Sequence, residues 1–335
     1  MFKDGKDSCI DSNHLKSGSS GTVTYDKKDP GKYVSKFYFS NVPIGPTFTF
    51  EVLVPDSLPE TSTTNPPTAP RENLELENCE LQERIGEGEF AEVYTANFHN
   101  TVVAVKLFKN KFKRDIHRLV ETEVNKLAQL RHPNVIQYMG TIVFQNRPGI
   151  VMEKMKMSLD DVLVENNEIS IQTKKKIFID IAQALCFIHS LPNSYHGDLK
   201  PANVLLNGEI TNASTIVVKL CDFSQARIRF AVTSSISSAT TIYTPRYAAP
   251  ELSLGLSKTS AIDIFSFGIL IWESLTGETP FLNEENVCKA ICGGDRPSVK
   301  NFDKNVSNLL TAMWQGKPDQ RPSISTVLQK MKEIF

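Results

Sequence analysis

The chain has 335 residues, more than a single hydrophobic core usually serves, so we expect two or more compact units. Its 37 Lys and Arg against 38 Asp and Glu give a formal net charge of −1, so nothing in the overall charge indicates a polyanion-binding surface. No stretch approaches the roughly 20 apolar residues of a membrane span. The sequence therefore predicts a globular protein with no nucleic-acid partner and no membrane span.

The six cysteines are scattered along the chain and form no CxxC pair. The closest two, Cys288 and Cys292, have no neighbouring His or Cys at zinc-ligand spacing. This usage is typical of reduced thiols in a reducing compartment. The first residues also lack the apolar core of a signal peptide. We therefore expect a cytoplasmic protein.

The first quarter of the chain differs in composition from the rest. Residues 1–30 are rich in Ser, Gly, Asp and Lys, which predicts a disordered segment. Residues 31–58 form a short β-rich segment of unknown role, in which Phe48 and Phe50 alternate with polar residues. Residues 59–73 are rich in Pro and Thr, as in an extended linker.

From about residue 74 the hydrophobic pattern becomes dense. Strand patterns in "LQERIGEGEFAEVYTANF", "TVVAVKLF" and "GIVMEKM" surround one amphipathic helix at 115–131. A second amphipathic helix follows at 171–190, and "AIDIFSFGILIWESL" is apolar nearly all round, as in a helix inside a sizeable domain. The order indicates an α+β fold with a strand-rich unit before a larger helical unit.

A glycine-rich turn, "GEGEFAEV", joins the first two of these strands. Gly86 and Gly88 lack Cβ atoms, so backbone N–H groups there can approach an anion. Such turns are common, and the signal is weak by itself. The turn leads from strand to strand rather than from strand to helix, and Ala91 stands where a third glycine would be. Both features argue against a dinucleotide-binding fold.

Lys106 lies within the apolar strand "VVAVKLF". Burying its ammonium without a partner would be costly. Either the strand is at an edge with the amine in solvent, or the ammonium points inward to meet phosphates and a carboxylate. The helix at 115–131 offers Glu121 and Glu123, and Glu123 shares the helix's apolar side more closely. We therefore expect Glu123 to be the partner.

Asp222 follows a buried strand, where a carboxylate is a natural Mg²⁺ ligand. An isolated aspartate at a strand end is more often a turn former. Here, however, Asp198 and Asn203 in "YHGDLKPANVLL" precede it, and the glycine-rich turn and Lys106 come before them. The joint occurrence of these residues in this order is hard to obtain by chance.

From about residue 74 to 335 the chain resembles a eukaryotic protein kinase domain. The family's motifs occur as "GEGEFAEV", "VAVK", "HGDLKPAN", "DFS" and "AAPE". "LRHPNVIQYMG" and "RPSISTVLQKM" further resemble the tyrosine-kinase-like branch, which is mostly Ser/Thr-specific. The resemblance implies a two-lobed fold: a small antiparallel-sheet N-lobe with one helix at 74–152, a hinge at 153–157 and a mainly helical C-lobe at 158–335.

The resemblance assigns a role to each polar residue. Asp198 would orient the substrate hydroxyl and accept its proton, and Lys200 would steady the γ-phosphate of ATP. Asn203 and Asp222 would hold Mg²⁺, with Mn²⁺ as an alternative. Lys106 would bind the α- and β-phosphates and pair with Glu123. The remaining nucleotide contacts would come from Ile85, Gly86, Gly88, Val93, Ala104, Met152, Glu153, Met155 and Leu205.

Two residues indicate the substrate class. Lys200, two positions after Asp198, resembles Ser/Thr kinases, and Thr244 in "YTPRYAAPE" stands where those kinases carry a threonine facing the catalytic loop. We expect Ser and Thr residues of proteins as substrates, in intracellular signalling. Dual specificity is the weaker alternative. The sequence gives no prediction of the oligomeric state.

The chain departs from the family pattern at two motif positions. Gly197 replaces the arginine of H-R-D, which predicts less dependence on phosphorylation of the activation loop, and Ser224 replaces the glycine of D-F-G. Both lend slight support to a pseudokinase that only binds nucleotide or partners. The loop's hydroxyls nevertheless suggest autophosphorylation at Thr233, Ser234, Ser235, Ser237, Ser238, Thr240 or Thr241.

Other residues are expected to support the fold rather than the chemistry. Glu251 and Arg321 resemble the family's buried ion pair, and Asp263 would accept hydrogen bonds from the catalytic-loop backbone. We expect His196 to pack near Phe223. Cys221, Trp272 and Trp314 are predicted core residues.

Overall fold

The computed structural model describes residues 79–88, 90–109, 116–165, 169–224, 226 and 244–335, with the backbone alone at 116–119, 121 and 122. It also assigns short strands between residues 2 and 52. The predicted linker at 59–73 and the candidate phosphorylation sites at 233–241 lie outside the described residues. The chain divides into two units, Met1–Pro70 and Arg71–Phe335.

The first unit contains a small antiparallel sheet with strand order β2-β1-β3-β6 and a separate β4-β5 pair. β1 and β2 lie within residues 1–30, for which the sequence predicts disorder. β6 includes the predicted alternating strand around Phe48 and Phe50. The strands are β1 (Phe2–Lys3), β2 (Lys6–Asp7), β3 (Gly31–Ser35), β4 (Tyr38–Phe39), β5 (Val42–Pro43) and β6 (Phe48–Val52).

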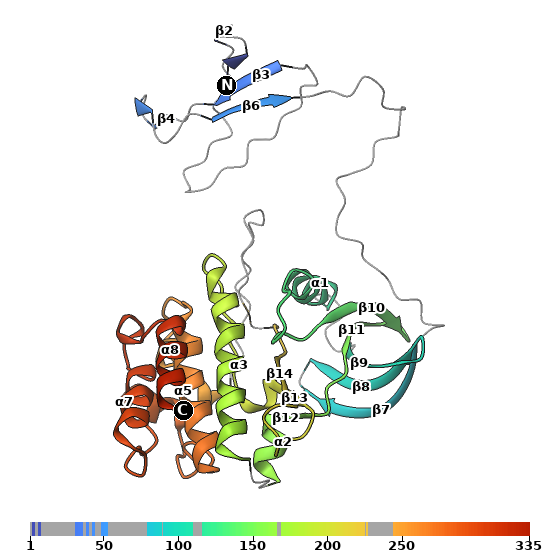
Figure 1. Ribbon diagram of the computed structural model, residues 1–335. Coiled ribbons are helices and arrows are strands. Elements are labelled where there is room, and N and C mark those ends of the chain that lie inside the picture. The colour runs from blue at the N-terminus through green and yellow to red at the C-terminus, as the bar shows by residue number, and fades with distance from the viewer. Residues whose placement is uncertain are drawn as a thin grey trace. The chain divides into compact units, whose positions relative to one another are not determined.

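The N-terminal part of the second unit is a five-stranded antiparallel sheet with one helix beside it (Figure 1). The strand order is β10-β11-β9-β8-β7, and α1 packs nearest to β11. The helix ends at residue 127, four residues before the predicted end. The elements are β7 (Cys79–Glu87), β8 (Ala91–Phe98), β9 (Thr101–Phe108), α1 (Ile116–Leu127), β10 (Tyr138–Phe144) and β11 (Arg147–Glu153).

Two-residue turns set the register of this sheet. The β8–β9 turn is His99-Asn100 and the β10–β11 turn is Gln145-Asn146, and all four residues have positive φ, as in type I′ turns. Facing residues of neighbouring strands share one side of a sheet. Gly86, Val93, Lys106 and Ile150 face one another in turn across β7, β8, β9 and β11, and therefore lie on one side.

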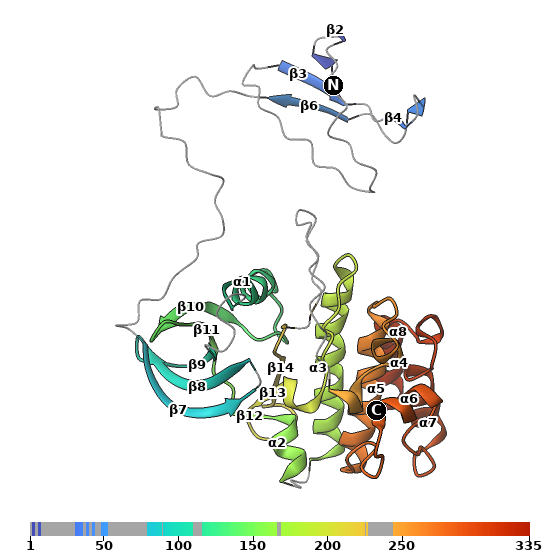
Figure 2. The same cartoon turned by 180° about the vertical axis from the view of Figure 1, so that it is seen from behind.

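The C-terminal part is mainly helical, as Figure 2 shows from behind. None of the helices in the described part is long and apolar enough to span a bilayer. The helices are α2 (Leu159–Val164), α3 (Ile171–Ser190), α4 (Pro250–Ser253), α5 (Ala261–Thr276), α6 (Val287–Gly293), α7 (Lys304–Met313) and α8 (Ile324–Ile334). The strands β12 (Met157–Ser158), β13 (Val204–Asn207) and β14 (Val217–Leu220) form a small sheet, and η4 (Pro201–Asn203), η5 (Pro245–Tyr247) and η6 (Pro318–Gln320) are single 3₁₀ turns.

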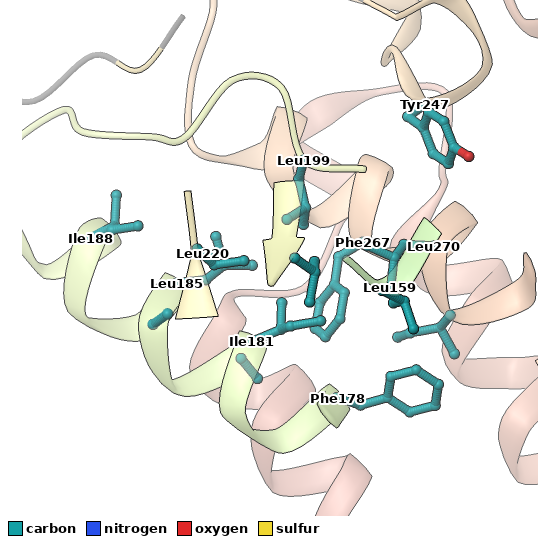
Figure 3. Packing of buried hydrophobic residues seen from close by; sticks show 14 of the residues in the cluster. Leu159, Phe178, Ile181, Leu185, Ile188, Leu199, Leu220, Tyr247, Phe267 and Leu270 are labelled. Carbon is teal, nitrogen blue, oxygen red and sulfur yellow. The ribbon is translucent and has the colours of Figure 1, made fainter. Parts of the chain in front are cut away.

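The core of this part forms around α3 and α5 (Figure 3). Ile181 and Leu185 of α3, Leu220 of β14 and Phe267 of α5 are fully buried in one cluster. Burial of each such side chain contributes about 1.5–3 kcal/mol. α5 is buried on nearly every side, as its composition predicts, and ends at Gly277 in the left-handed conformation. The two-lobed α+β architecture predicted from the sequence is confirmed.

Candidate active site

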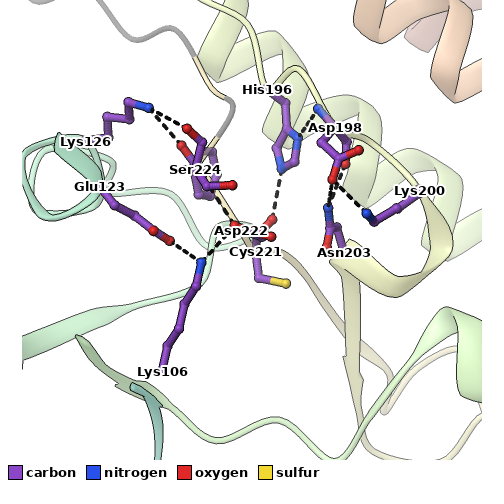
Figure 4. Close-up of polar contacts among 11 residues, drawn as sticks. Lys106, Glu123, Lys126, His196, Asp198, Lys200, Asn203, Cys221, Asp222 and Ser224 are labelled. Carbon is purple, nitrogen blue, oxygen red and sulfur yellow. Dashed lines mark hydrogen bonds and ion pairs between the residues drawn. The ribbon is translucent and has the colours of Figure 1, made fainter. Parts of the chain in front are cut away.

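Lys106 stands at the centre of an ion-pair network that joins three elements (Figure 4). Its Nζ lies 2.7 Å from Oε1 of Glu123 on α1 and 2.9 Å from Oδ1 of Asp222, which follows β14. The ammonium therefore points inward, and the edge-strand alternative is wrong. The partner on α1 is Glu123, as expected, and this residue is only 3% exposed.

The charges in this network stabilise one another. Burial disfavours the Lys106 ammonium, but the Asp222 and Glu123 carboxylates outweigh that cost and raise the pKa of Lys106 above its ordinary value. Burial likewise opposes ionisation of Asp222, yet Lys106 holds the pKa of this carboxyl well below its usual range. Burial raises the pKa of Glu123. Asp222 is thus an ionised carboxylate at neutral pH.

The catalytic loop, residues 196–203, is fixed by one buried carboxylate on α5. Asp263 Oδ2 accepts the backbone N–H of His196 at 2.8 Å, and Oδ1 accepts that of Gly197 at 2.9 Å. His189 Nε2 of α3 lies 2.8 Å from Oδ2. This confirms the predicted role of Asp263. Gly197 has φ +88°, a left-handed conformation that glycine adopts without strain.

Asp198 lies within a group of polar side chains in this loop. Lys200 Nζ is 2.8 Å from Asp198 Oδ2 and donates to Thr244 Oγ1 at 2.8 Å. The Thr244 hydroxyl in turn donates to Asp198 Oδ1 at 3.2 Å. Asn203 Nδ2 donates to the Asp198 carbonyl at 2.7 Å and to its Oδ2 at 3.2 Å. The four residues hold one another in place.

The two groups are connected through the backbone around Cys221. The Cys221 N–H donates to the Asn203 carbonyl at 3.0 Å, and the Cys221 carbonyl lies 2.9 Å from His196 Nε2. The His196 ring packs on Phe223 with ring centroids 5.0 Å apart, as expected. Asp222 is therefore tied to both the catalytic loop and Lys106. Burial raises the pKa of the Cys221 thiol, which disfavours its reactive thiolate form, and the side chain is partly buried against the large core rather than inside it.

Asn203 and Asp222 form a suitable donor set for a hard divalent cation. An amide oxygen and an ionised carboxylate are ligands that Mg²⁺ prefers, and Mg²⁺ usually keeps several waters besides one or two protein ligands. Among the described residues, no group of three or more His, Cys, Asp and Glu side chains could hold a metal ion. Asn203 and Asp222 could each supply one oxygen ligand to such a cation.

The predicted nucleotide contacts are distributed over the sheet and the segment after it. Val93 and Lys106 lie on the same side of the five-stranded sheet as Gly86. Ala104, two residues before Lys106 on β9, lies on this side too and pairs with Met152 of β11. Gly88 N–H donates to the Ala91 carbonyl at 2.8 Å, which closes the glycine-rich turn. Ile85 is 41% exposed and lies where the β7 register is irregular.

The remaining predicted contacts lie around the segment between β11 and β12. Glu153 directs its carboxylate to Lys219 and to the Gln137 N–H, and its own N–H donates to the Gln137 carbonyl at 3.1 Å, so neither its side chain nor its N–H is available for the predicted adenine contact. Met155 is 6% exposed, and its carbonyl accepts the Lys154 ammonium at 2.6 Å. Leu205 on β13 is half-buried against the large core.

Two features of the site were not found by sequence reasoning. Lys126 on α1 donates to the carbonyl oxygens of Phe223 and Ser224, at 3.0 and 3.2 Å. Burial lowers the pKa of Lys126 to about 8. In the glycine-rich hairpin, Glu87 pairs with Lys109 at 2.7 Å. The position of Lys126, one helical turn after Glu123, was the only feature of the sequence that could have indicated this contact. Its acceptors are backbone carbonyl oxygens, which a pattern of side chains does not reveal.

Comparison with known proteins gives a consistent result. Residues 79–331 match the family described as "Protein kinase domain". A probable serine/threonine-protein kinase from Dictyostelium discoideum is 33% identical over 282 residues, which cover 81% of this chain and 26% of that protein. The serine/threonine-protein kinase VIK from Arabidopsis thaliana is 31% identical over 288 residues, 80% of this chain and 64% of VIK.

This chain therefore spans less than two thirds of the length of these relatives. The family match nevertheless covers more than half of the chain, from the first strand of the five-stranded sheet to the last helix. The fold, with its inward-facing lysine and its catalytic loop anchored on α5, agrees with that match. The chain belongs to the protein kinase family.

Proposed function

We propose that this chain is a protein serine/threonine kinase that transfers the γ-phosphoryl group of ATP to hydroxyl groups of protein substrates. The observation that carries the proposal is the Asp198 carboxylate, which lies within hydrogen-bond distance of Lys200 and Thr244. Asn203 is bonded to the same residue, and Asp222 connects this group to Lys106. The relatives' description as serine/threonine-protein kinases supports the same function.

In the proposed reaction, Asp198 orients the substrate hydroxyl and accepts its proton. The hydroxyl oxygen forms a bond to the γ-phosphorus while the bond between this phosphorus and the β–γ bridging oxygen breaks, so that ADP leaves. Lys200 offsets negative charge on the transferred group, and Lys106 holds the α- and β-phosphates. The protein contributes positioning and charge rather than a covalent intermediate.

Protein kinases generally use ATP with a divalent cation, and we propose Mg²⁺ held by Asn203 and Asp222. The cation would neutralise charge on the phosphates that the protein side chains do not reach. Asp222 is poised for this role because its carboxyl is ionised at neutral pH. Asn203 Nδ2 is bonded to Asp198, which leaves the amide oxygen as the donor to the cation. Residues 153–157 would form the hinge that contacts adenine.

Serine and threonine are the proposed acceptors because Lys200 and Thr244 both contact the Asp198 carboxylate, where the substrate hydroxyl would bind. Lys200 Nζ bridges the Asp198 carboxylate and the Thr244 hydroxyl. This hydroxyl fixes the position of the ammonium and, through it, the distance between Asp198 and an incoming short side chain. Dual specificity remains the weaker alternative.

The test is transfer of labelled phosphate from ATP to a generic Ser/Thr protein substrate with Mg²⁺. Asp198→Asn should lower kcat on the order of 10²–10⁴-fold, the usual contribution of a positioned acid–base group. Asp319→Asn, an exposed aspartate on η6, is the matched control and should retain full activity. Equal turnover of the Asp198 variant and the wild type would reject Asp198 as the base.

The pseudokinase alternative predicts a different result in the same assay. A pseudokinase would bind ATP, measured by a thermal shift, yet transfer no phosphate above the Asp198→Asn background. The complete polar set of Lys106, Glu123, Asp198, Asn203 and Asp222 argues against this alternative. Phosphoamino-acid analysis of the product then separates Ser/Thr from Tyr acceptors.

A further inference from the structure

A lysine outside the predicted catalytic set connects α1 to the segment after β14. Lys126 Nζ donates to the Phe223 carbonyl at 3.0 Å and to the Ser224 carbonyl at 3.2 Å (Figure 4). The side chain is half-buried and lies one helical turn after Glu123. Because the acceptors are backbone atoms, Lys126 constrains the course of the chain itself rather than another side chain.

Lys126 completes a closed ring of contacts. Lys106 connects Glu123 of α1 to Asp222, and Lys126 connects the next turn of α1 to Phe223 and Ser224. Residues 222–224 are thus held at two points: Asp222 is bound by Lys106 of β9, which also binds Glu123 of α1, and Phe223 and Ser224 are bound by Lys126 of α1. The second contact adds a direct connection between α1 and this segment.

The far side of the same segment is anchored in the C-terminal part. The Phe223 side chain is fully buried and packs on the His196 ring of the catalytic loop. The preceding carbonyl, of Cys221, lies 2.9 Å from His196 Nε2. Lys126 therefore ties α1, which belongs to the N-terminal part, to a segment fixed on the catalytic loop. It spans the same two regions that must come together around ATP.

We propose that Lys126 is a positioning residue that holds α1 and residues 222–224 in a single register. With Lys126 in place, the Lys106–Glu123 and Lys106–Asp222 contacts exist at the same time. Without it, α1 and the segment move independently and the complete site is populated less often. Lys126 touches no reacting atom in this scheme. The inference rests on the proposed kinase function, because its effect on activity is exerted through Lys106 and Asp222.

The first measurement is steady-state kinetics of three variants. Lys126→Met keeps the length of the side chain and removes its charge and donors, and should lower kcat/KM for ATP roughly tenfold, as for loss of hydrogen bonds from a charged group. Lys126→Arg can still donate to both carbonyls and should stay within about threefold of the wild type. Lys330→Met, at an exposed position of α8, is the matched control and should change nothing.

The second measurement is hydrogen–deuterium exchange of the nucleotide-free protein, which does not depend on activity. Amides of α1 and of residues 222–224 should exchange faster in Lys126→Met, and at the wild-type rate in Lys126→Arg and Lys330→Met. The melting temperature of Lys126→Met should stay close to that of the wild type, since the large core is untouched.

The outcomes separate this inference from the proposed function. Wild-type kinetics and exchange in Lys126→Met would overturn the inference. Equal losses of activity in the Met and Arg variants, with a lowered melting temperature, would also overturn it, because they would indicate a packing role. An inactive wild-type protein would reject the proposed function, whereas faster exchange of both segments in Lys126→Met would still support the tether.

Discussion

The catalytic loop and the segment 222–224 lie side by side, yet they are held in different ways. The loop is bonded through its backbone N–H groups to Asp263, a carboxylate on the most deeply buried helix. Residues 222–224 are held by the ammonium groups of Lys106 and Lys126, which extend from β9 and α1. Both segments are therefore attached to the core, the second through the buried Phe223 side chain, but only residues 222–224 are joined to the N-terminal part by buried or half-buried ammonium groups.

This difference predicts which changes unfold the protein and which only disable it. A buried acceptor whose donors cannot find water is costly to remove. An ion pair between two elements can be lost while each element keeps its own apolar packing. The N-terminal sheet has a small apolar cluster of its own, with Val103, Val105, Ile142 and Val151 among its members, whereas Phe108 and Ile150 belong to the large cluster.

The largest effect is expected at Asp263. Asp263→Ala leaves the N–H groups of His196 and Gly197 and the His189 ring without their acceptor, and should lower the free energy of unfolding by about 3–5 kcal/mol. Urea denaturation measures it. The matched control is Asp303→Ala, because Asp303 also accepts two backbone N–H groups but caps an exposed helix end, where the loss is about 1 kcal/mol. Equal costs at the two sites would contradict the argument from burial.

The next effect concerns the ion pairs that join residues 222–224 to the N-terminal part. Lys106→Met should lower kcat/KM for ATP about 10²-fold, the scale of one lost electrostatic contact to the reacting group. The fold should survive, because burial already raises the pKa of Glu123 and allows that carboxyl to become neutral. Circular dichroism and kinetics test both statements. The exposed Lys300→Met serves as control, and global unfolding of the Lys106 variant would erase the distinction between the two segments.

A smaller effect depends on pH and lies in the C-terminal core. Burial raises the pKa of Glu273 to about 7, although the Tyr247 hydroxyl donates to it at 2.7 Å; Asp160 adds to the rise and Arg246 opposes it. Between about pH 4.5 and 7 the folded state keeps a proton that the unfolded state has lost. Stability should therefore fall by about 3 kcal/mol as pH rises through this window.

Glu273→Gln removes that titration and isolates it from all others. The difference in melting temperature between the variant and the wild type should shift in favour of the variant from pH 5 to pH 8. Tyr247→Phe, which removes the hydroxyl but not the carboxyl, should keep the pH dependence. A constant difference between Glu273→Gln and the wild type at both pH values would show that Glu273 does not titrate in this range.

The smallest effect is expected at Gly197. Its φ of +88° costs a side-chain-bearing residue about 1 kcal/mol, so Gly197→Ala should destabilise the protein by that amount. Gly293 on α6 has open space around its added Cβ and no positive φ, and Gly293→Ala is the control. Chemical denaturation compares the two. A stabilised Gly197→Ala would mean that the loop relaxes out of the left-handed conformation.

The sequence predicted those contacts of the site in which a charged residue lies within an apolar stretch. Lys106 within a run of valines required a carboxylate, and the spacing of apolar residues on α1 selected Glu123. The buried Glu251–Arg321 pair was also predicted and is present, with two hydrogen bonds of 2.6 and 2.8 Å. These ion pairs could be predicted from the sequence because both partners have charged side chains.

Other features could not be predicted for physical reasons. The acceptors of Lys126 are carbonyl oxygens, which every residue carries. The early end of α1 depends on turns at residues 128–129 rather than on the apolar spacing, which continues through Leu130. The left-handed Gly197 is defined by its bond to Asp263, 66 residues away. Such features depend on backbone geometry that forms only when distant segments meet.

The two-residue turn at His99-Asn100 limits the insertions and deletions that this domain can tolerate. Side chains alternate between the two sides of a strand, so one inserted or deleted residue in that turn would move Lys106 to the opposite side of the sheet. Substitutions that tolerate positive φ, such as Asn-Gly, should be harmless there. The number of residues in this surface turn is thus constrained more tightly than their identity, although the turn contacts no residue of the site.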